Sequence, residues 1–517
     1  MTIARMFTPR ICLAALAAML PVHGPAAAQA PVTTASGALQ GESAGGLTVY
    51  KGIPFAAPPI GALRWKAPAP PESWEGVRKA DAFAPACIQN TDMFAAMGET
   101  RLPTSEDCLY LNVWTPAKAA SDRLPVMVWI HGGGFTTGGT GTPMFDGSKL
   151  ASRGVVVVTI AYRLGALGFL AAGELSAESP TRSSGAYGIM DQVAALNWVH
   201  RNVAAFGGDP AKVTIFGESA GGMSVSALAS SPKTEGLFRG VIAQSGAYFP
   251  QPNAAPGAPG SRYTLASAEA EGARFLQTLA TGSIAEARAK PADEVLRAAE
   301  GGHFRFAPVA DDVFLAKDPF AAYAAGRFRD TPVLIGFNSD EGALFVQSMG
   351  AGQFKAMVAA QYGPKAPAIL AAYPAGSDLE ALASARRLFG DSALAWPVWT
   401  WAQLQSRYRG KVFAYYFDHK VPHPDAPMFQ GVSGAFHGSD LAYVFGVPVP
   451  GWQPQDDSIS SLIIDYWTSF ARTGDPNGAG RPAWPNYTQA NPVFLELGPR
   501  PHPIPVPNIE RLGVFGQ

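Results

Sequence analysis

The stretch VTIFGESAGG, residues Val213–Gly222, decides the fold of this chain. Its first four residues are β-branched or aromatic and predict a buried strand, whereas the small residues of Gly222–Ser230 predict a helix. Between them the pattern G-x-S-x-G is centred on Ser219. Glycines on both sides leave room for a sharp, strained turn, which exposes the serine hydroxyl at the helix N-terminus. The stretch therefore predicts a serine nucleophile; without the strand and the helix, the same pattern would be a chance match.

Strand and helix patterns alternate around this turn. Apolar runs at residues 125–130 and 155–160 predict strands that are buried on both faces, as in a parallel sheet. Residues 191–205 predict a helix whose apolar positions face that sheet, and Gly207 and Gly208 end it. Further strands are predicted at residues 240–244, 331–336 and 412–417, and a β-meander at residues 31–60. This alternation predicts an α/β fold with a large, mostly parallel central sheet and helices on both faces.

The composition fits one large folded unit. Apolar residues make up 47% of the chain and charged residues 15%, so a sizeable core is available. Segments 250–300 and 350–410 are rich in Ala, Glu and Arg and predict helical insertions between strands. No internal repeat or low-complexity linker divides the chain, so residues 31–517 are expected to form a single domain. The net charge of −1 gives no electrostatic reason to expect nucleic acid or an anionic membrane as a partner.

Residues 1–30 have the features of a secretory signal peptide. Arg5 and Arg10 form a basic region, and the apolar run 11–20 after it is too short to span a bilayer. Ala28–Ala30 fits an A-x-A cleavage site, so the mature chain is expected to begin at Pro31. We expect export to a periplasm or out of the cell; the alternative for this segment is a membrane anchor.

The cysteines agree with export. Cys12 lies in the signal segment, which leaves Cys87 and Cys108 as an even pair suited to one disulfide in an oxidising compartment. Closing a loop of this size contributes about 3 kcal/mol to stability. The alternative is a pair of free, buried thiols.

A glycine-rich loop follows the strand at residues 125–130. The sequence HGGGF, His131–Phe135, places three successive glycines where the backbone can approach a ligand with its N–H groups pointing outward. Beside a serine turn, this pattern predicts an oxyanion hole rather than a plain flexible turn. His131 is expected to hold the loop through its ring nitrogens, because a base must reach the serine from the opposite side.

A serine hydroxyl needs an imidazole to take its proton and a carboxylate to orient that imidazole. In such a fold the nucleophile comes first along the chain, then the acid, then the base. His437, in a glycine-flanked loop after the last clear strand, fits the position of the base. Asp340 and Glu341 follow the strand at residues 331–336, and the residues alone leave the choice between these two carboxylates open.

The chain resembles the type-B carboxylesterase/lipase family, which includes bacterial nitrobenzyl-type esterases, animal carboxylesterases and cholinesterases. The resemblance covers nearly the whole mature length. The motifs that carry it are YKGIP (50–54), EDCLYLN (106–112), HGGGF (131–135), FGGDP (206–210), GESAGG (217–222) and DEG (340–342). It implies the α/β-hydrolase fold with helical cap insertions. The segment between Cys87 and Cys108 contains no tryptophan, unlike the choline-binding loop of cholinesterases.

The resemblance also implies a role for individual residues. Glu341 matches the family's acid and His437 its base. The oxyanion donors match the backbone N–H groups of Gly133, Gly134 and Ala220. Glu218 and Ser245 match residues beside the acid and base that do not themselves react, and Cys87 with Cys108 matches the N-terminal disulfide.

The expected activity is hydrolysis of small-molecule carboxylic esters through an acyl-enzyme on Ser219, without a metal or other cofactor. Because the base must be neutral, activity is expected to fall at acid pH through an imidazole pKa near 6.5. An interfacial lipase is one alternative. A non-catalytic adhesion relative is another, although such proteins typically lack the nucleophile. The sequence leaves the natural ester and the oligomeric state open.

Overall fold

The computed structural model describes residues 30–92, 102–251, 262–302, 304–423 and 425–516. The expected signal peptide therefore lies outside the described residues, apart from Ala30. Within these ranges, no helix is both long enough and apolar enough to cross a membrane.

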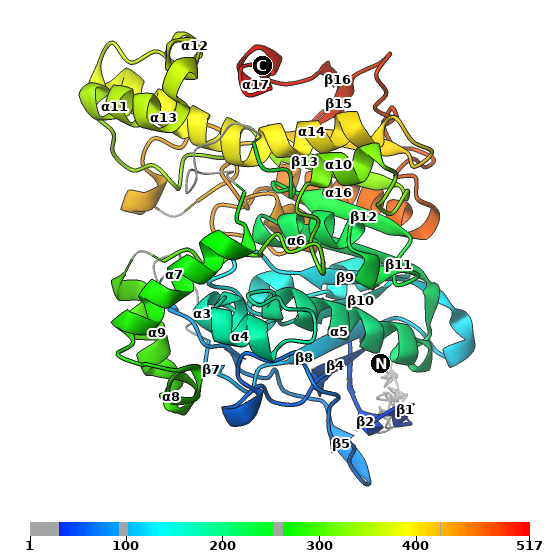
Figure 1. Cartoon of the computed structure of the whole chain (residues 1–517). Helices are drawn as coiled ribbons and strands as arrows, with labels where there is room; N and C mark the ends of the chain where they lie inside the picture. The colour runs from blue at the N-terminus through cyan, green and yellow to red at the C-terminus, as the bar shows by residue number, and fades with distance from the viewer. Residues whose placement is uncertain (1–29, 93–101, 252–261, 303, 424, 517) are drawn as a thin grey trace, which may run out of the picture.

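An eleven-stranded sheet runs through the molecule (Figure 1). Its strands, in spatial order, are β16 (His502–Pro505), β15 (Val493–Leu497), β14 (Val412–Phe417), β13 (Val333–Asn338), β12 (Gly240–Gln244), β11 (Gly208–Glu218), β9 (Leu124–Ile130), β10 (Val156–Ile160), β8 (Tyr110–Thr115), β4 (Leu47–Pro54) and β3 (Glu42–Ala44). Every pair from β15 across to β10 is parallel, whereas the pairs at the two ends are antiparallel. The prediction of a large, mostly parallel sheet is confirmed.

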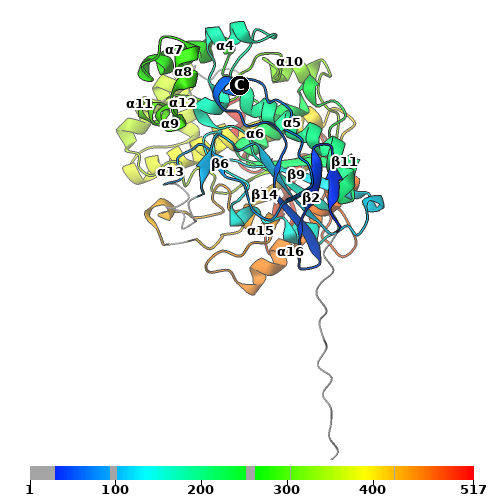
Figure 2. The same cartoon turned by 90° about the horizontal axis from the view of Figure 1, so that it is seen from below.

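Alternate side chains of each central strand enter two different apolar cores. In β9, Val126 and Val128 belong to one core and Met127 and Trp129 to the other, because successive side chains point to opposite faces of a sheet. The first core lies under α5 (Tyr187–Asn202), α6 (Ala220–Ala229) and α14 (Trp396–Gln405); the second lies under α2 (Ser148–Ala151), α15 (Leu441–Phe445) and α16 (Pro454–Thr473). Figure 2 shows α5 and α6 on one side of the sheet and α15 and α16 on the other.

Two predicted elements differ from the structure by more than two residues at an end or in their pairing. The helix expected at residues 191–205 is α5, which begins at Tyr187 and ends at Asn202. The expected meander is split between two sheets: β3 and β4 join the main sheet, whereas β1 (Val32–Thr34) and β2 (Gly37–Gln40) pair with β5 (Val77–Lys79). The two local hairpins, β1–β2 and β3–β4, are present, but β2 does not pair with β3. Each hairpin joins its sheet through a more distant strand, β5 or β8, which a local pattern does not reveal.

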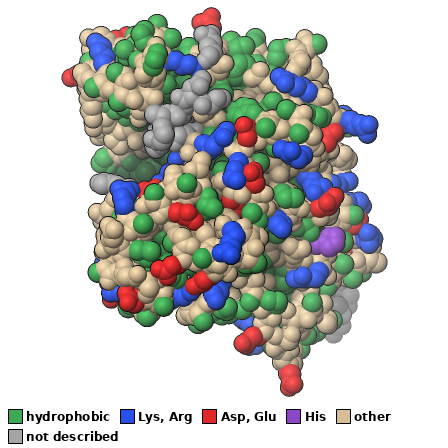
Figure 3. Space-filling view, viewed as in Figure 1, with side chains coloured by type: hydrophobic (Ala, Val, Ile, Leu, Met, Phe, Trp, Pro, Cys, Tyr) green, Lys and Arg blue, Asp and Glu red, His purple; other side chains and the backbone are tan. Residues whose placement is uncertain are grey.

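Two groups of inserted helices lie beyond one end of the central strands, on the left in Figure 1. One group comprises α7 (Leu265–Thr278), α8 (Ile284–Ala289) and α9 (Ala292–Gly301); the other comprises α11 (Ala351–Tyr362), α12 (Ala366–Ala372) and α13 (Asp378–Gly390). The surface is hollowed between these two groups, at the left of Figure 3. A π-helical turn, Asp391–Ala395, continues α13 directly into α14, so no loop separates the second insertion from the helix on the sheet.

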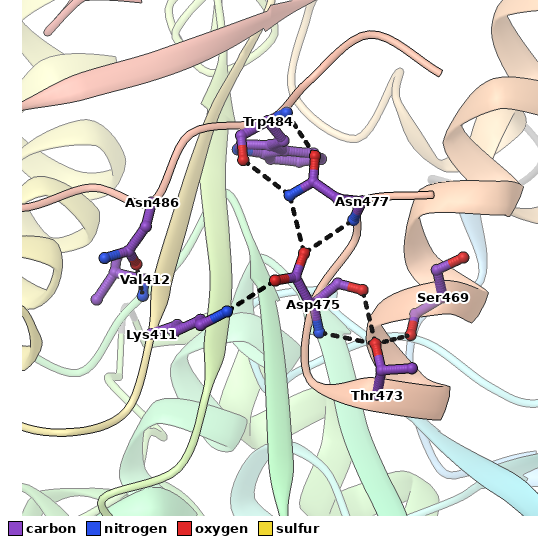
Figure 4. A network of polar contacts seen from close by, with 8 residues as sticks. All are labelled: Lys411, Val412, Ser469, Thr473, Asp475, Asn477, Trp484 and Asn486. Atoms are coloured by element: carbon purple, nitrogen blue, oxygen red, sulfur yellow. Dashed lines mark hydrogen bonds and ion pairs between the residues drawn. The ribbon is translucent and has the colours of Figure 1, made fainter. Parts of the chain in front are cut away.

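A polar network fixes the chain after α16 to β14 (Figure 4). Asp475 accepts hydrogen bonds from Lys411 Nζ at 2.8 Å and from Asn477 N at 3.0 Å. Asn477 in turn accepts a 2.7 Å bond from Trp484 N, and Asn486 accepts a 2.8 Å bond from Val412 N. These side chains accept hydrogen bonds from backbone N–H groups that are not paired within the sheet. They thereby fix the segment that connects α16 to β15.

Candidate active site

Ser219 lies at the turn between β11 and α6. Its backbone has φ 56° and ψ −121°, a region that a residue with a side chain rarely adopts. A 2.8 Å hydrogen bond from Ser219 N to Gln244 O holds the turn against β12. Any Cβ at Gly221 would collide with the carbonyl oxygen of Ile130, so the glycine lets α6 pack directly on β9. The strained turn predicted from the sequence is therefore present.

The glycine loop after β9 lies against this turn. A Cβ on Gly132 would be 2.8 Å from Glu218 O and 3.1 Å from Ser219 Cβ, so only glycine permits this approach. The carbonyl of Gly133 accepts 3.0 Å hydrogen bonds from the N–H groups of Thr136 and Thr137, which makes the loop a defined turn. The N–H groups of Gly133 and Gly134 donate to no other described residue. Both can therefore donate to an added group.

His131 holds this loop, as expected. Its Nδ1 is 3.0 Å from Gly132 O, and its ring stacks on Tyr162 with centroids 4.5 Å apart. The hydroxyl of Tyr162 donates to His131 O at 2.9 Å. Complete burial lowers the pKa of His131 to about 4, so this imidazole stays neutral and structural.

The structure brings Glu341 to His437. His437 Nδ1 lies 2.6 Å from Glu341 Oε2, and the other carboxylate oxygen accepts a 2.7 Å bond from Asn338 N. Asp340 turns the other way and accepts from the N–H groups of Ser433 and Gly434, at 2.7 and 3.3 Å. The geometry thus separates the two adjacent carboxylates: one contacts the imidazole, whereas the other caps the loop that precedes it.

Glu218 lies on the opposite side of the imidazole. Its Oε1 is 3.2 Å from His437 Nε2, whereas Ser219 Oγ makes no hydrogen bond to the imidazole among the described residues. Burial raises the pKa of Glu218 to about 8. Burial alone would lower the pKa of His437, but the carboxylates of Glu218 and Glu341 outweigh it and raise this pKa to about 9. The fall of activity at acid pH, expected near pH 6.5 from the sequence, is therefore expected at a higher pH.

A third buried carboxylate, Asp440, was not assigned a role from the sequence. It accepts hydrogen bonds from Gln244 Nε2 at 2.7 Å, Asn338 Nδ2 at 3.2 Å and Tyr415 OH at 3.3 Å. It thereby ties the loop of His437 to the ends of β12, β13 and β14. Its place three residues after the predicted base is the only sequence signal that pointed to it.

Ser245 follows β12 at the same edge of the sheet. Its backbone has φ 50°, and its N–H donates to Gly336 O at 2.8 Å. The side chain is fully buried, and its hydroxyl has no hydrogen-bond partner within the described part of the chain. Ser245 thus lies near the strand that carries the acid, without a bond to either Glu341 or His437.

An apolar cavity of about 250 Å³ lies beside the glycine loop. Leu164 and Leu167, next to and within α3 (Gly165–Phe169), form one wall, and Val295 of α9 forms another. Thr136, two residues after Gly134, also lines it. Two residues span at most about 7 Å, so the cavity begins close to the predicted oxyanion donors.

The predicted disulfide is present between Cys87 and Cys108. Among the residues that the structure describes, no group of three or more His, Cys, Asp and Glu side chains is arranged to hold a metal ion. A strained serine turn, a glycine loop packed against it and an imidazole paired with Glu341 are groups of the kind that acyl transfer uses.

Comparison with known proteins gives consistent matches over most of the chain. The model of the carboxylesterase family matches residues 28–508. The chain is 39% identical to the para-nitrobenzyl esterase of Bacillus subtilis over 492 residues, covering 90% of this chain and 94% of that protein. It is 37% identical to the fumonisin B1 esterase of Sphingopyxis macrogoltabida over 489 residues, covering 89% and 85%. Among solved structures, a PNB esterase superposes with a TM-score of 0.81 and 34% identity, covering 94% of this chain and 99% of that one.

Proposed function

The chain belongs to the carboxylesterase family, has the α/β-hydrolase fold and is a carboxylic ester hydrolase, and on that premise we propose that it works through an acyl-enzyme on Ser219. His437 is the general base and Glu341 its carboxylate partner. The N–H groups of Gly133, Gly134 and Ala220 form the oxyanion hole.

The reaction has two halves. His437 takes the hydroxyl proton of Ser219 as Oγ attacks the ester carbonyl, and the oxyanion is stabilised by the backbone donors. His437 then gives that proton to the alcohol oxygen as the C–O bond breaks, which leaves the acyl group on Ser219. Water, deprotonated by the same imidazole, releases the acid and restores the serine. Losing one oxyanion donor typically costs about 3 kcal/mol in the barrier.

The observation that carries this proposal is the 2.6 Å contact between His437 Nδ1 and Glu341 Oε2, next to the strained turn of Ser219. In the neutral imidazole, a carboxylate on Nδ1 fixes the tautomer whose Nε2 carries no proton and can accept one. In a free enzyme the hydrogen bond between the nucleophile and its general base is often long or poorly aligned, and it tightens when substrate binds.

The substrates we propose are small uncharged esters. The relatives named above act on a para-nitrobenzyl ester and on fumonisin B1 by their names, so the family scaffold accepts different alcohols and acids. The apolar cavity beside the glycine loop favours an uncharged substituent in this chain.

The test is pre-steady-state hydrolysis of p-nitrophenyl acetate and p-nitrophenyl butyrate. The wild type is expected to release a burst of one nitrophenol per chain. Ser219→Ala should abolish the burst and lower kcat by at least about 10⁴-fold. Ser230→Ala, at the far end of α6, is the matched control and should keep both. A burst that survives in Ser219→Ala would refute the proposed nucleophile.

We also propose that the protein is exported, with cleavage after Ala30. The A-x-A sequence at Ala28–Ala30 and the disulfide between Cys87 and Cys108 support this proposal, because disulfides persist in oxidising compartments.

A further inference from the structure

A buried arginine lies between the segment that carries Glu341 and the segment that carries His437. Arg386 of α13 is only 8% exposed, and an arginine is seldom so buried unless it is paired. Within the described part of the chain it forms no ion pair with a carboxylate. Its charge is compensated in another way, by backbone carbonyl groups.

The guanidinium binds carbonyls of both segments. Its Nε donates to Val346 O at 2.8 Å, its Nη1 to Gly431 O at 3.0 Å and its Nη2 to Gln430 O at 3.0 Å. The first of these lies in what we call the acid segment, residues 341–346, and the other two lie in the base segment, residues 430–437. The planar guanidinium therefore joins the segment of the acid to the segment of the base.

The backbone fits closely around this arginine. A Cβ on Gly342 would collide with Arg386 O, so the residue after Glu341 packs directly on α13. Gly431 has φ 73°, and a Cβ there would lie 2.8 Å from Arg386 Nη1. Glycine at these two positions lets both segments approach the arginine closely enough for its hydrogen bonds.

The two segments are also held together nearer to the imidazole. Asp340, directly before the acid segment, accepts a hydrogen bond from Ser433 N at 2.7 Å. Asn338 Nδ2 donates to Phe436 O at 2.9 Å. These bonds fix the end of the base segment, whereas Arg386 fixes its beginning. The separation of the two segments is thus set at both ends.

We propose that Arg386 is a positioning residue that holds Glu341 at hydrogen-bonding distance from His437. This inference rests on the proposed function and extends it to a residue that touches neither the substrate nor the imidazole. Hydrogen bonds from a guanidinium are charge-assisted and fixed in direction, so neither segment can shift without breaking a strong bond. A misplacement of about 1 Å in an active site can cost about 100-fold in rate.

The test is the pH profile of kcat/KM for p-nitrophenyl butyrate in Arg386→Met, which keeps an unbranched stem but donates no hydrogen bond. Against the effect of burial, the carboxylates of Glu218, Glu341 and Asp440 raise the pKa of His437. Loss of a nearby cation would by itself stabilise the imidazolium and move the midpoint of the acid limb upward. Displacement of Glu341 removes a carboxylate from the imidazolium and moves the midpoint downward.

The sign of the change therefore decides the matter. In Arg386→Met we expect the midpoint to fall by at least about half a pH unit and the plateau of kcat/KM to fall by about tenfold to 100-fold. A midpoint that rises or stays in place overturns the inference. Arg387→Met changes the exposed neighbour on α13; it is the matched control and should keep the wild-type profile.

A second variant, Arg386→Lys, separates charge from geometry and serves also if Arg386→Met does not fold. Lysine keeps the charge, but its single ammonium group lacks the planar array of donors that reaches both segments. The midpoint and the plateau should fall as in Arg386→Met, by smaller amounts. A wild-type profile in Arg386→Lys would overturn the inference.

A double-mutant cycle distinguishes positioning from a general loss of structure. In the Glu341→Gln background, Arg386→Met should lower kcat/KM by less than about twofold, because the contact that it supports is already altered. A loss as large as in the wild-type background would mean that Arg386 only stabilises the fold, and would overturn the inference. If the wild type hydrolyses no p-nitrophenyl ester, the proposed function itself fails; wild-type turnover with unchanged Arg386 variants refutes only this inference.

Discussion

At the scale of single residues, the electrostatics of His437 distinguish this site from an isolated imidazole. Glu218, Glu341 and Asp440 all act on it from buried positions, and together they raise its pKa to about 9 against the effect of burial. Burial in turn raises the pKa of Glu218 to about 8. Glu218 and His437 titrate together because they are so close. The pH profile therefore gives the apparent pKa values of the pair rather than of one residue.

The pH profile of kcat/KM tests this coupling. Because the neighbouring carboxylates raise the pKa of His437, we expect the acid limb of the wild type to fall through a midpoint above 6.5. Glu218→Gln removes a carboxylate that stabilises the imidazolium, so the midpoint should move down by about one pH unit. Glu235→Gln, whose side chain is 82% exposed, is the matched surface control and should not move it. A midpoint of Glu218→Gln at or above that of the wild type would contradict the proposed coupling.

The residues alone left the choice between Asp340 and Glu341 open, and only the resemblance to the family implied Glu341. The two carboxylates are neighbours in one turn, and each has the chemistry that the imidazole needs. Their side chains point apart because the loop at Ser433 and Gly434 offers N–H groups to Asp340. That loop lies more than ninety residues away in the chain, so local sequence does not show which carboxylate accepts its hydrogen bonds.

At the scale of elements, α5 holds one partner of a buried ion pair that the predicted helix did not reveal. Asp191 was predicted to begin the helix, a common place for an acidic residue, but it lies inside α5 and is fully buried. It accepts hydrogen bonds from Arg163 N, Nε and Nη2 at 3.0, 2.8 and 2.7 Å. The partner was not predictable, because twenty-eight residues separate the two.

Breaking this pair should be costly. Asp191→Ala leaves the guanidinium of Arg163 buried without its carboxylate, so we expect a loss of about 3–5 kcal/mol in the free energy of unfolding. Urea unfolding followed by fluorescence measures it. Asp465→Ala breaks the half-exposed pair with Arg153 and should cost less than about 1 kcal/mol. Similar losses of unfolding free energy in the two variants would show that the buried pair stabilises the protein no more than the half-exposed pair.

At the scale of the whole molecule, export and the disulfide are linked. Expressed with its own leader in a bacterium with an oxidising periplasm, the chain should yield a mature N-terminus at Pro31. Cys87 and Cys108 should then react with a maleimide only after reduction. The leaderless protein from a reducing cytosol lacks the disulfide, so its free energy of unfolding should be lower by about 3 kcal/mol. N-terminal sequencing, thiol labelling and denaturant titration check the three parts.

The matched control for this comparison is the double variant Cys87→Ser/Cys108→Ser, which should be equally stable from either compartment. A purified periplasmic protein that still begins at Met1, or free thiols in the mature chain, would contradict the proposed export.

The sequence by itself determined the class of fold, the turn at Ser219 and the glycine loop, and it predicted the order of nucleophile, acid and base. These features depend on short-range steric and apolar patterns: which residues permit a strained turn, and which runs are buried on both sheet faces. The pairing of Glu341 with His437 was implied by the resemblance to the family. Only the tertiary structure decided that Asp440 ties three strands to the histidine loop and that Asp191 pairs with Arg163. Each of these contacts joins residues that are distant in the chain, and their geometry follows from how the sheet and its helices pack rather than from any local pattern.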